Sequence, residues 1–344
     1  MTHNIPFDDR INVKSELSDL KYPLIRNYLE AVNSSLLNNL ETKKVEDLAR
    51  DLRIADGPKE YFKPLNVDLL FFNDRPENFF PYSRIELVNI LDPTGQGMEE
   101  RIFSGPIDQQ LRDVLSYIRN NVISEKVFKI KDQAEAIRVK NYSYEALEEF
   151  ISNAIYHKSY QEYEPITIRI EKEQIEIASV PGPDRSISDA DIRNYRMRTR
   201  RYRNRRIGDF LKELHLVEGR NTGIPTALKG IKDNGSPLPK LLTDEDRSFF
   251  SVILPIHEKF LEEETTVIKK RAKRRKKEEI KELILKELNS QDLSATSIYR
   301  NLGYSGSLSK TFRTCIDELI SESKIKYLEE NMNSSNNLIT KIIK

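Results

Sequence analysis

The hydrophobic residues of the first 258 positions follow two different periods. Spacings of three to four residues predict helices, over residues 21–40, 44–52, 106–122, 144–156, 207–214 and 224–232. Alternating or short apolar runs predict strands, over residues 66–72, 84–90, 126–139, 166–170, 175–178 and 249–255. We expect the first two strands to pair as a hairpin. Helices and strands mixed in this order predict an α+β fold.

A charge-dense segment follows this part of the chain. Eight of the nine residues 269–277 are Lys or Arg, which favours a basic linker. Beyond it, helices are predicted over 278–288, 294–302 and 308–321 and short strands over 324–328 and 338–343, an order typical of a winged helix-turn-helix. The predicted domains are a helical and hairpin region over 1–125, an α/β domain over 126–258, the linker over 259–277 and the winged helix over 278–344.

The length and composition fit a chain with more than one domain. A chain of 344 residues exceeds what one hydrophobic core usually supports. The 56 Lys and Arg residues nearly balance the 55 Asp and Glu residues, so only local clusters of cations can attract nucleic acid. The one cysteine, Cys315, excludes an internal disulfide and a cysteine zinc site. No apolar run approaches 18 residues and no secretory leader begins at Met1, so we expect a cytoplasmic protein without a membrane partner.

Two polar residues of one predicted helix have the types that magnesium chemistry needs. Glu149 and Asn153 are four positions apart, which puts a carboxylate and a carboxamide on the same helix face. An amide oxygen can bind Mg²⁺, and a carboxylate can take a proton from an attacking water molecule. The spacing alone favours the plainer interpretation, which is a solvated polar face.

The residues around this pair are more specific. The stretch 145–160, EALEEFISNAIYHKSY, closely resembles a helix of bacterial ATP-binding proteins labelled RecG-related, whose pattern is roughly E-A-L-R-E-A-L-V-N-A-hydrophobic-x-H-R-D-Y. Their domain is similar to the gyrase, Hsp90, histidine-kinase and MutL (GHKL) ATPases. The resemblance implies a GHKL-like α/β sandwich that binds ATP and Mg²⁺, with Glu149 as general base and Asn153 as magnesium ligand. His157 would touch phosphate or metal one turn later, or pack as a hydrogen-bonded neighbour.

The next strand and turn continue the resemblance. Residues 174–183, QIEIASVPGP, are similar to the family's R-I-E-I-x-N-P-G-G-L strand and turn. GHKL proteins place an Asp at the strand end for the adenine amino group, whereas this chain has Ser179 there and one glycine, Gly182, in the turn. A serine hydroxyl can accept the same hydrogen bond but carries no charge, so adenine would be held by a weaker contact. A plain turn is the alternative.

Two later segments match the family's phosphate-binding region. Arg203 and Asn204 precede a predicted helix, as in the family's R-N-x-x-hydrophobic pattern. Residues 221–224, NTGI, are similar to the family's G-x-G-I loop, with Asn221 in place of the first glycine. Backbone amides at such a turn would cradle phosphates. The resemblance thus assigns nucleotide binding to Arg203, Asn221, Thr222 and Gly223.

Arginines gather in the segment that would cover the nucleotide. Eight of the fourteen residues 193–206 are Arg, interleaved with two tyrosines. Arg198, Arg200 and Arg201 could neutralise triphosphate oxygens, or they could bind a nucleic-acid backbone together with tyrosine stacking. A solvated loop is the third interpretation.

The predicted winged helix offers few cationic contacts. Lys310 and Arg313 stand at the start of its third helix, where such domains place side chains that contact DNA. Winged helices also serve as protein-interaction or dimer modules, so this fold alone does not establish DNA binding. The basic linker would add salt-sensitive affinity for phosphate backbones, or it forms a solvated helix end.

The resemblance covers most of residues 5–258. Many relatives carry an N-terminal Schlafen-type AlbA nucleic-acid-binding domain before this region, and its absence ahead of Phe7 indicates a natural short form or a fragment. A helicase is excluded because the chain has no G-x-x-x-x-G-K-[ST] phosphate loop.

These features lead to one main hypothesis and two alternatives. The main hypothesis is an ATP- and Mg²⁺-dependent DNA-binding regulator with slow ATP hydrolysis, because one carboxylate and no second catalytic cation are evident. The first alternative is a DNA-binding or assembly module whose GHKL-like scaffold no longer binds nucleotide. The second is a defence-system component that acts with an AlbA-domain partner protein. A homodimer is expected by analogy with GHKL relatives.

Overall fold

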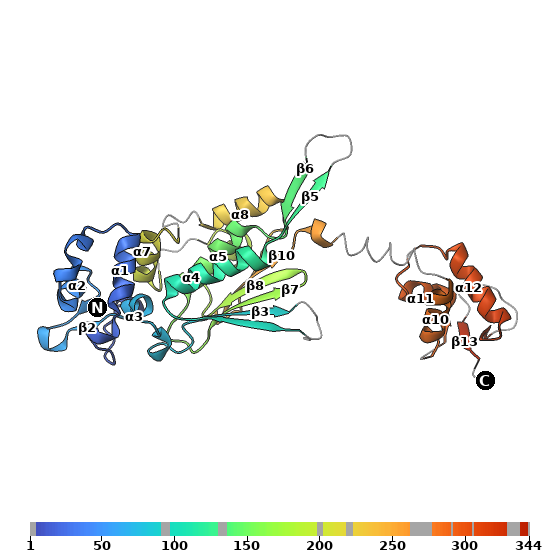
Figure 1. Ribbon diagram of the computed structural model, residues 1–344, viewed down its shortest axis with the longest axis horizontal. Helices are drawn as coiled ribbons and strands as arrows, with labels where there is room; N and C mark the ends of the chain where they lie inside the picture. Colours follow the sequence, from blue (N-terminus) through green and yellow to red (C-terminus); the bar gives the residue numbers. More distant parts are fainter. Residues whose placement is uncertain are drawn as a thin grey trace. The chain divides into compact units, whose positions relative to one another are not determined.

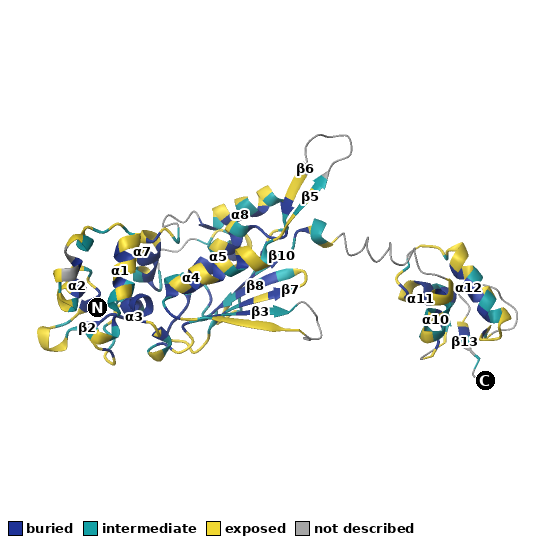
Figure 2. Ribbon diagram, in the orientation of Figure 1, coloured by how far each residue is buried: buried dark blue, intermediate teal, exposed yellow. Residues whose placement is uncertain are grey.

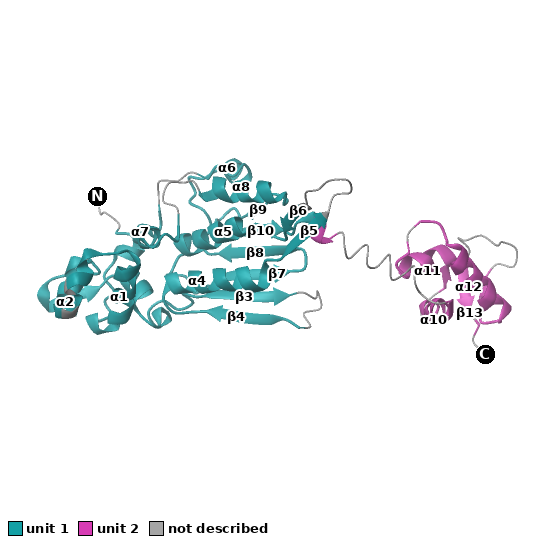
Figure 3. Ribbon diagram, turned by 45° about the horizontal axis from the view of Figure 1, so that its top comes forward, with its two compact units in different colours: residues 1–258 teal, residues 259–344 magenta. Residues whose placement is uncertain are grey.

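The computed structural model divides the chain into two compact units (Figure 3). Unit 1 comprises residues 1–258 and unit 2 comprises residues 259–344. Within these units the structure describes residues 5–90, 97–129, 136–197, 202–217, 223–261, 277–289, 292–304, 306–328 and 338–342.

Among the described residues, six strands form one mixed sheet at the centre of unit 1 (Figure 1). In spatial order they are β4 Glu99–Phe103, β3 Ile85–Ile90, β7 Ile166–Glu171, β8 Gln174–Ser179, β10 Phe250–Pro255 and β9 Lys240–Leu242. Strands β3 and β7 are parallel, and the other neighbours are antiparallel. Along β8, Ile175, Ile177 and Ser179 are buried and the residues between them are half-buried. This period of two gives the sheet one apolar face.

A layer of helices covers that face (Figures 1 and 2). It consists of α4 Ile107–Tyr117, α5 Tyr144–His157 and α8 Gly223–Asn234. Ser143 begins α5 as its N-cap by accepting a hydrogen bond from the backbone N–H of Ala146 at 3.3 Å. The remaining elements here are η6 Ile118–Val122, β5 Glu125–Lys129, β6 Ala136–Lys140, α6 Asp189–Arg193 and α7 Arg205–Glu213. The predicted α+β fold class is confirmed.

Short helices make up the first part of unit 1. They are η1 Phe7–Asp9, η2 Leu17–Asp19, α1 Tyr22–Ala31, η3 Ser35–Thr42, α2 Val45–Asp51, η4 Lys59–Tyr61, α3 Asn66–Phe72 and η5 Pro76–Asn78, with a small ribbon of β1 Ala55–Asp56 and β2 Lys63–Pro64. A continuous hydrophobic core of described residues extends from Leu20 through the sheet to Leu254. The predicted regions 1–125 and 126–258 therefore share this core.

The strand predicted over residues 66–72 is wrong. This segment is helix α3, and every one of its residues is buried. A short apolar run that is buried on all sides carries no amphipathic period, so the pattern cannot distinguish a strand from a helix. Strand β3 consequently pairs with β4 and β7 and forms no hairpin with residues 66–72.

The long helix predicted over residues 21–40 is interrupted. Helix α1 ends at Ala31, and the chain continues as the 3-10 helix η3 from Ser35. Between them Asn33 has a φ of 52°, a left-handed conformation that Asn tolerates better than most residues. The apolar period continues across the break, which explains why the sequence pattern does not reveal it.

A fully buried asparagine joins the end of α5 to the start of α7. The side-chain Nδ2 of Asn204 donates to the carbonyl oxygens of Tyr156, at 3.0 Å, and Lys158, at 2.7 Å. These carbonyls lie at the C-terminal end of α5, where the last carbonyl groups of a helix have no donor within the helix. Asn204 therefore satisfies them and fixes the position of α7.

A buried carboxylate from the N-terminal helices completes this junction. The Oδ2 atom of Asp8 accepts hydrogen bonds from the backbone N–H groups of Arg206, at 2.7 Å, and Ile207, at 3.1 Å. Burial raises the pKa of Asp8, and these two N–H groups oppose the rise. A negative charge here would also suit the positive end of the α7 dipole.

Unit 2 has its own hydrophobic core. Its elements are α10 Lys277–Glu287, β11 Leu293–Ser294, α11 Ala295–Asn301, α12 Lys310–Ser321, β12 Ile325–Tyr327 and β13 Leu338–Lys341. Strand β13 pairs antiparallel with both β11 and β12. Cys315 is buried in this core. The winged-helix assignment stays a prediction. Across the described ranges of both units, no helix has the length and apolar character needed to span a membrane.

A buried carboxyl on α3 makes the stability of unit 1 depend on pH. Asp68 is fully buried, and neither of its carboxylate oxygens has a hydrogen-bond partner in the described part of the chain. Burial raises the pKa of Asp68 well above its ordinary value, and the charge of Arg206 opposes the rise. The native protein therefore keeps this proton to a higher pH than the unfolded chain, which releases it at about pH 4.

We predict that Asp68→Asn stabilises unit 1 increasingly as the pH rises above about 4, the ordinary pKa of the carboxyl group. In this range the group lowers the wild-type free energy of unfolding by up to about 1.4 kcal/mol per pH unit, because the unfolded state binds fewer protons than the native state. Urea unfolding followed by circular dichroism measures the difference, and Asp233→Asn on the exposed surface of α8 is the control. A difference between wild type and Asp68→Asn that stays constant with pH contradicts the protonated carboxyl.

Candidate functional site

A cavity of about 700 Å³ lies over the sheet in unit 1. This volume is within the range of small-molecule sites. Its walls come from α5, the ends of β8 and β10, the segments 181–187 and 195–197, α7 and the start of α8. The described residues predicted to bind nucleotide or metal all line it, namely Glu149, Asn153, His157, Ser179, Gly182, Arg203 and Gly223.

The Glu149 and Asn153 side chains are in direct contact on the cavity face of α5. The Nδ2 of Asn153 donates to Oε1 of Glu149 at 2.8 Å. This bond leaves the amide oxygen of Asn153 without a hydrogen bond in the described part of the chain, so it is available as a ligand oxygen. The helix thus presents one carboxylate and one amide oxygen to the same cavity.

Gly223 packs directly against this pair. A Cβ atom added to Gly223 would lie 1.6 Å from Oε1 of Glu149, so only glycine permits the carboxylate to sit over the start of α8. The backbone N–H groups of the first helical turn have no intrahelical partners and carry the positive end of the helix dipole. Asn221 and Thr222, predicted to cradle phosphates beside it, lie outside the described residues.

Another part of the cavity lining is apolar. Ile177, Phe250 and Val252 of β8 and β10 form its floor, and Ser179 stands at the end of β8. The Ser179 side chain makes no hydrogen bond with any described residue. This part of the lining therefore combines an apolar surface with one hydroxyl group.

Gly182 brings the turn after β8 close to the β9–β10 connection. Its N–H donates to the carbonyl oxygen of Arg247 at 2.7 Å, and a Cβ at this position would lie 2.7 Å from both Thr243 Oγ1 and the Phe249 carbonyl oxygen. The single glycine expected here is therefore required by close packing.

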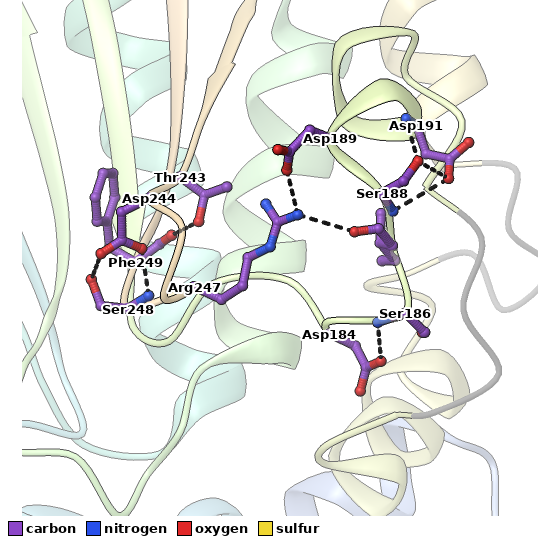
Figure 4. A network of polar contacts seen from close by, with 11 residues as sticks. Asp184, Ser186, Ser188, Asp189, Asp191, Thr243, Asp244, Arg247, Ser248 and Phe249 are labelled. Carbon is purple, nitrogen blue, oxygen red and sulfur yellow. Dashed lines mark hydrogen bonds and ion pairs between the residues drawn. The ribbon is translucent and has the colours of Figure 1, made fainter.

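An arginine holds the next part of this wall (Figure 4). Nη2 of Arg247 donates to the carbonyl oxygen of Ile187 at 3.1 Å and pairs with Asp189 Oδ1 at 2.5 Å. Ser188 caps α6 by accepting from the backbone N–H of Asp191 at 3.1 Å. The segment 182–191 is thereby tied to the β9–β10 turn, which makes it a preformed wall.

Arg203 bridges the two sides of the cavity mouth. Its guanidinium donates to the carbonyl oxygens of His157 and, at 3.3 Å, of Gly182. Burial, and then the charge of Arg203, lower the pKa of His157 to about 4, so this imidazole is neutral at physiological pH. Its ring packs nearly parallel to Tyr156 and Tyr202, with centroids 4.6 and 6.5 Å away. His157 is thus a neutral, aromatically packed wall residue.

Several cavity residues were not predicted from the sequence. Gly208, Asp209 and Lys212 lie on α7, Tyr156 lies on α5 and Asp184 lies in the segment 181–187, while Tyr202 and Arg205 belong to the arginine-rich segment predicted to cover the nucleotide. The spacing of 205, 208, 209 and 212 marks a helix face, which was the available signal. This signal was hard to recognise because the same helix also carries the apolar residues that pack into the core.

The other predicted contacts lie elsewhere. Arg198, Arg200 and Arg201 are outside the described residues, as is most of the basic linker. Lys310 and Arg313 are exposed on α12 of unit 2.

The protein oxygens of this cavity suit a magnesium ion that is also bound by a phosphate ligand. Within the described ranges, no group of three or more His, Cys, Asp or Glu side chains is arranged to hold a metal ion. Mg²⁺ commonly takes one or two protein oxygens and completes its octahedron with phosphate and water. The Asn153 oxygen fits that mode of binding.

Part of unit 1 is similar to an ATPase-like domain. Residues 164–254 match the family model HATPase_c_4, described as "Putative ATP-dependent DNA helicase recG C-terminal". The matched stretch begins just before β7 and ends in β10, so it includes Gly182 and α7, while Glu149 and Asn153 precede it. The match supports the ATPase-like part of the resemblance, and with it a nucleotide-binding role.

One solved structure extends the likeness in fold. The crystal structure of the DIP2311 protein from Corynebacterium diphtheriae is similar with a TM-score of 0.55 and 16% sequence identity. The similarity covers 92% of this chain and 60% of that one. No curated protein sequence matches the chain.

We predict that Gly208→Ala destabilises unit 1 by about 1–3 kcal/mol, the usual range for overpacking. A Cβ on Gly208 would lie 2.4 Å from the Tyr156 ring, which itself packs against both His157 and Tyr202. Urea unfolding measures the loss. In Gly223→Ala the added Cβ clashes with the flexible end of Glu149. We therefore expect Gly223→Ala to lose much less stability than Gly208→Ala.

A double variant tests the cause of this loss. Gly208→Ala combined with Tyr156→Leu should lose less stability than the two single changes added together. Additive losses would show that the ring contact is not responsible.

Proposed function

We propose that unit 1 binds ATP with Mg²⁺ in this cavity and hydrolyses it slowly. One observation carries this function: Glu149, Asn153 and Gly223 meet in a cavity that is also lined by the apolar side chains Ile177, Phe250 and Val252 and by Ser179. A nucleotide needs both environments, because its phosphates and metal are polar and its base is flat and largely apolar. The ATPase-like match over residues 164–254 supports the same function.

In the proposed complex, Asn153 would give its amide oxygen to Mg²⁺, and the free N–H groups at the start of α8 would meet the phosphates. Bound Mg²⁺ supplies charge neutralisation on the phosphate oxygens. Glu149 would orient a water molecule and take its proton. Ser179 would accept a hydrogen bond from the amino group of adenine.

We predict that Asn153→Ala weakens Mg-ATP binding at least about tenfold, because a charge-assisted contact of this kind is worth about 1.5–3 kcal/mol. Glu149→Gln should retain binding and lose hydrolysis, since the amide cannot take a proton. Titration calorimetry and phosphate release measure the two effects. Glu148→Gln, on the exposed side of the same helix, is the matched control.

No binding of millimolar Mg-ATP to the intact chain would contradict nucleotide binding. The chain would then be a DNA-binding or assembly module on a scaffold without nucleotide.

We also propose that unit 2 binds DNA as a winged helix and that nucleotide in unit 1 regulates this binding. Lys310 and Arg313 are exposed on the first half of α12. The acidic residues of its second half are partly neutralised from α10, because Lys281 pairs with both Glu318 and Glu322 at 2.7 Å. The positive charge and the positive end of the helix dipole therefore coincide at the start of α12.

We predict that Lys310→Ala and Arg313→Ala each weaken DNA binding by the full chain and lower the slope of log K against log salt by about 1, as expected for one lost phosphate contact. Fluorescence anisotropy with duplex DNA at several salt concentrations measures both quantities, with and without Mg-ATP. Lys286→Ala on α10 removes the same charge as a control. Unchanged affinity in both variants rejects α12 as the contact.

A further inference from the structure

Helix α7 presents two different faces. Phe210 packs on Tyr28, Phe71 and Phe72, with ring centroids 4.9 to 5.7 Å apart. The opposite face, with Arg205, Gly208, Asp209 and Lys212, lines the cavity. The helix is thus anchored by its apolar face. This packing fixes where its polar residues lie along the cavity wall.

Contacts at both ends of α7 show which part of α5 lies beside Lys212. At the start, Asn204 bonds the carbonyl oxygen of Tyr156. Beyond the other end, the Leu216 carbonyl oxygen lies 3.5 Å from Ser152 Oγ. Asn153 follows Ser152 directly, and Lys212 is four residues before Leu216, whereas Arg205 follows Asn204 at the C-terminal end of α5.

The cations of the cavity differ in what else they bind. The cationic residues among its described lining are Arg196, Arg203, Arg205 and Lys212. Arg203 is committed to two backbone carbonyls. None of Arg196, Arg205 and Lys212 makes a side-chain hydrogen bond or ion pair with any described residue. Of these three, Lys212 is the nearest along the chain to the Leu216 contact beside Asn153.

We propose that Lys212 is a polyphosphate-binding residue of this cavity, positioned beside the Asn153 site to contact the phosphates that carry the metal. The assignment rests on the proposed nucleotide function. An ammonium group held on a packed helix supplies the positive charge that phosphoryl oxygens need, because charge-assisted hydrogen bonds are the strong ones. Such a cation also favours the charge that develops on the phosphates during transfer.

The test compares ligands with and without phosphates. Titration calorimetry of the full chain uses Mg-ATP, adenosine and inorganic tripolyphosphate. Lys212→Ala should weaken Mg-ATP and tripolyphosphate by about tenfold or more, which is the effect of losing one charged contact. Its affinity for adenosine should match the wild type. Lys212→Arg should recover most of the affinity, and Lys229→Ala, on an exposed part of α8 outside the cavity lining, should change nothing.

The outcomes distinguish a failure of the Lys212 assignment from a failure of the proposed nucleotide function. If the wild type binds Mg-ATP and Lys212→Ala binds it equally well, or loses adenosine and Mg-ATP affinity alike, the assignment of Lys212 is overturned while nucleotide binding stands. If the wild type binds tripolyphosphate through Lys212 but not ATP, the phosphate site stands and the nucleotide function fails. Binding of neither ligand overturns both.

Discussion

The candidate site depends on the buried junction where α5 ends and α7 begins. Asn204 is fully buried and takes up two carbonyl groups at the end of α5, and Asp8 takes up two N–H groups at the start of α7. Each of these backbone groups would otherwise be left without a partner, at a cost of about 1–3 kcal/mol if buried. Two short side chains therefore fix the relative position of the helices that form one wall of the cavity.

The same constraint joins the N-terminal helices to the cavity. Asp8 comes from the start of the chain, and Phe210 of α7 packs among aromatic residues of α1 and α3. The helix that carries Lys212 is therefore part of the common core and not a surface loop. On the other side, Arg247 ties the segment after Gly182 to the β9–β10 turn (Figure 4). Both walls are built before any ligand arrives, which lowers the entropic cost of binding.

Much of this arrangement could be predicted from the sequence, and the failures have physical causes. Helix α5 and strands β7 and β8 have clear periods because each has one buried face. Helix α3 was mistaken for a strand because all of its residues are buried. Glu149 and Asn153 were recognisable by spacing and resemblance, whereas Lys212 was not, because its position depends on how α7 packs and its lysine resembles any surface cation. The partners of Asn204 are likewise set by tertiary structure alone.

The most direct test of the nucleotide site is a crystal structure of the chain grown with Mg²⁺ and a non-hydrolysable ATP analogue. The structure described above predicts the base over Ile177 and Val252 beside Ser179, the metal at the amide oxygen of Asn153, and the phosphates between the start of α8 and Lys212. An analogue bound outside this cavity, or an empty cavity at saturating analogue, would contradict the assignment of the ATP site.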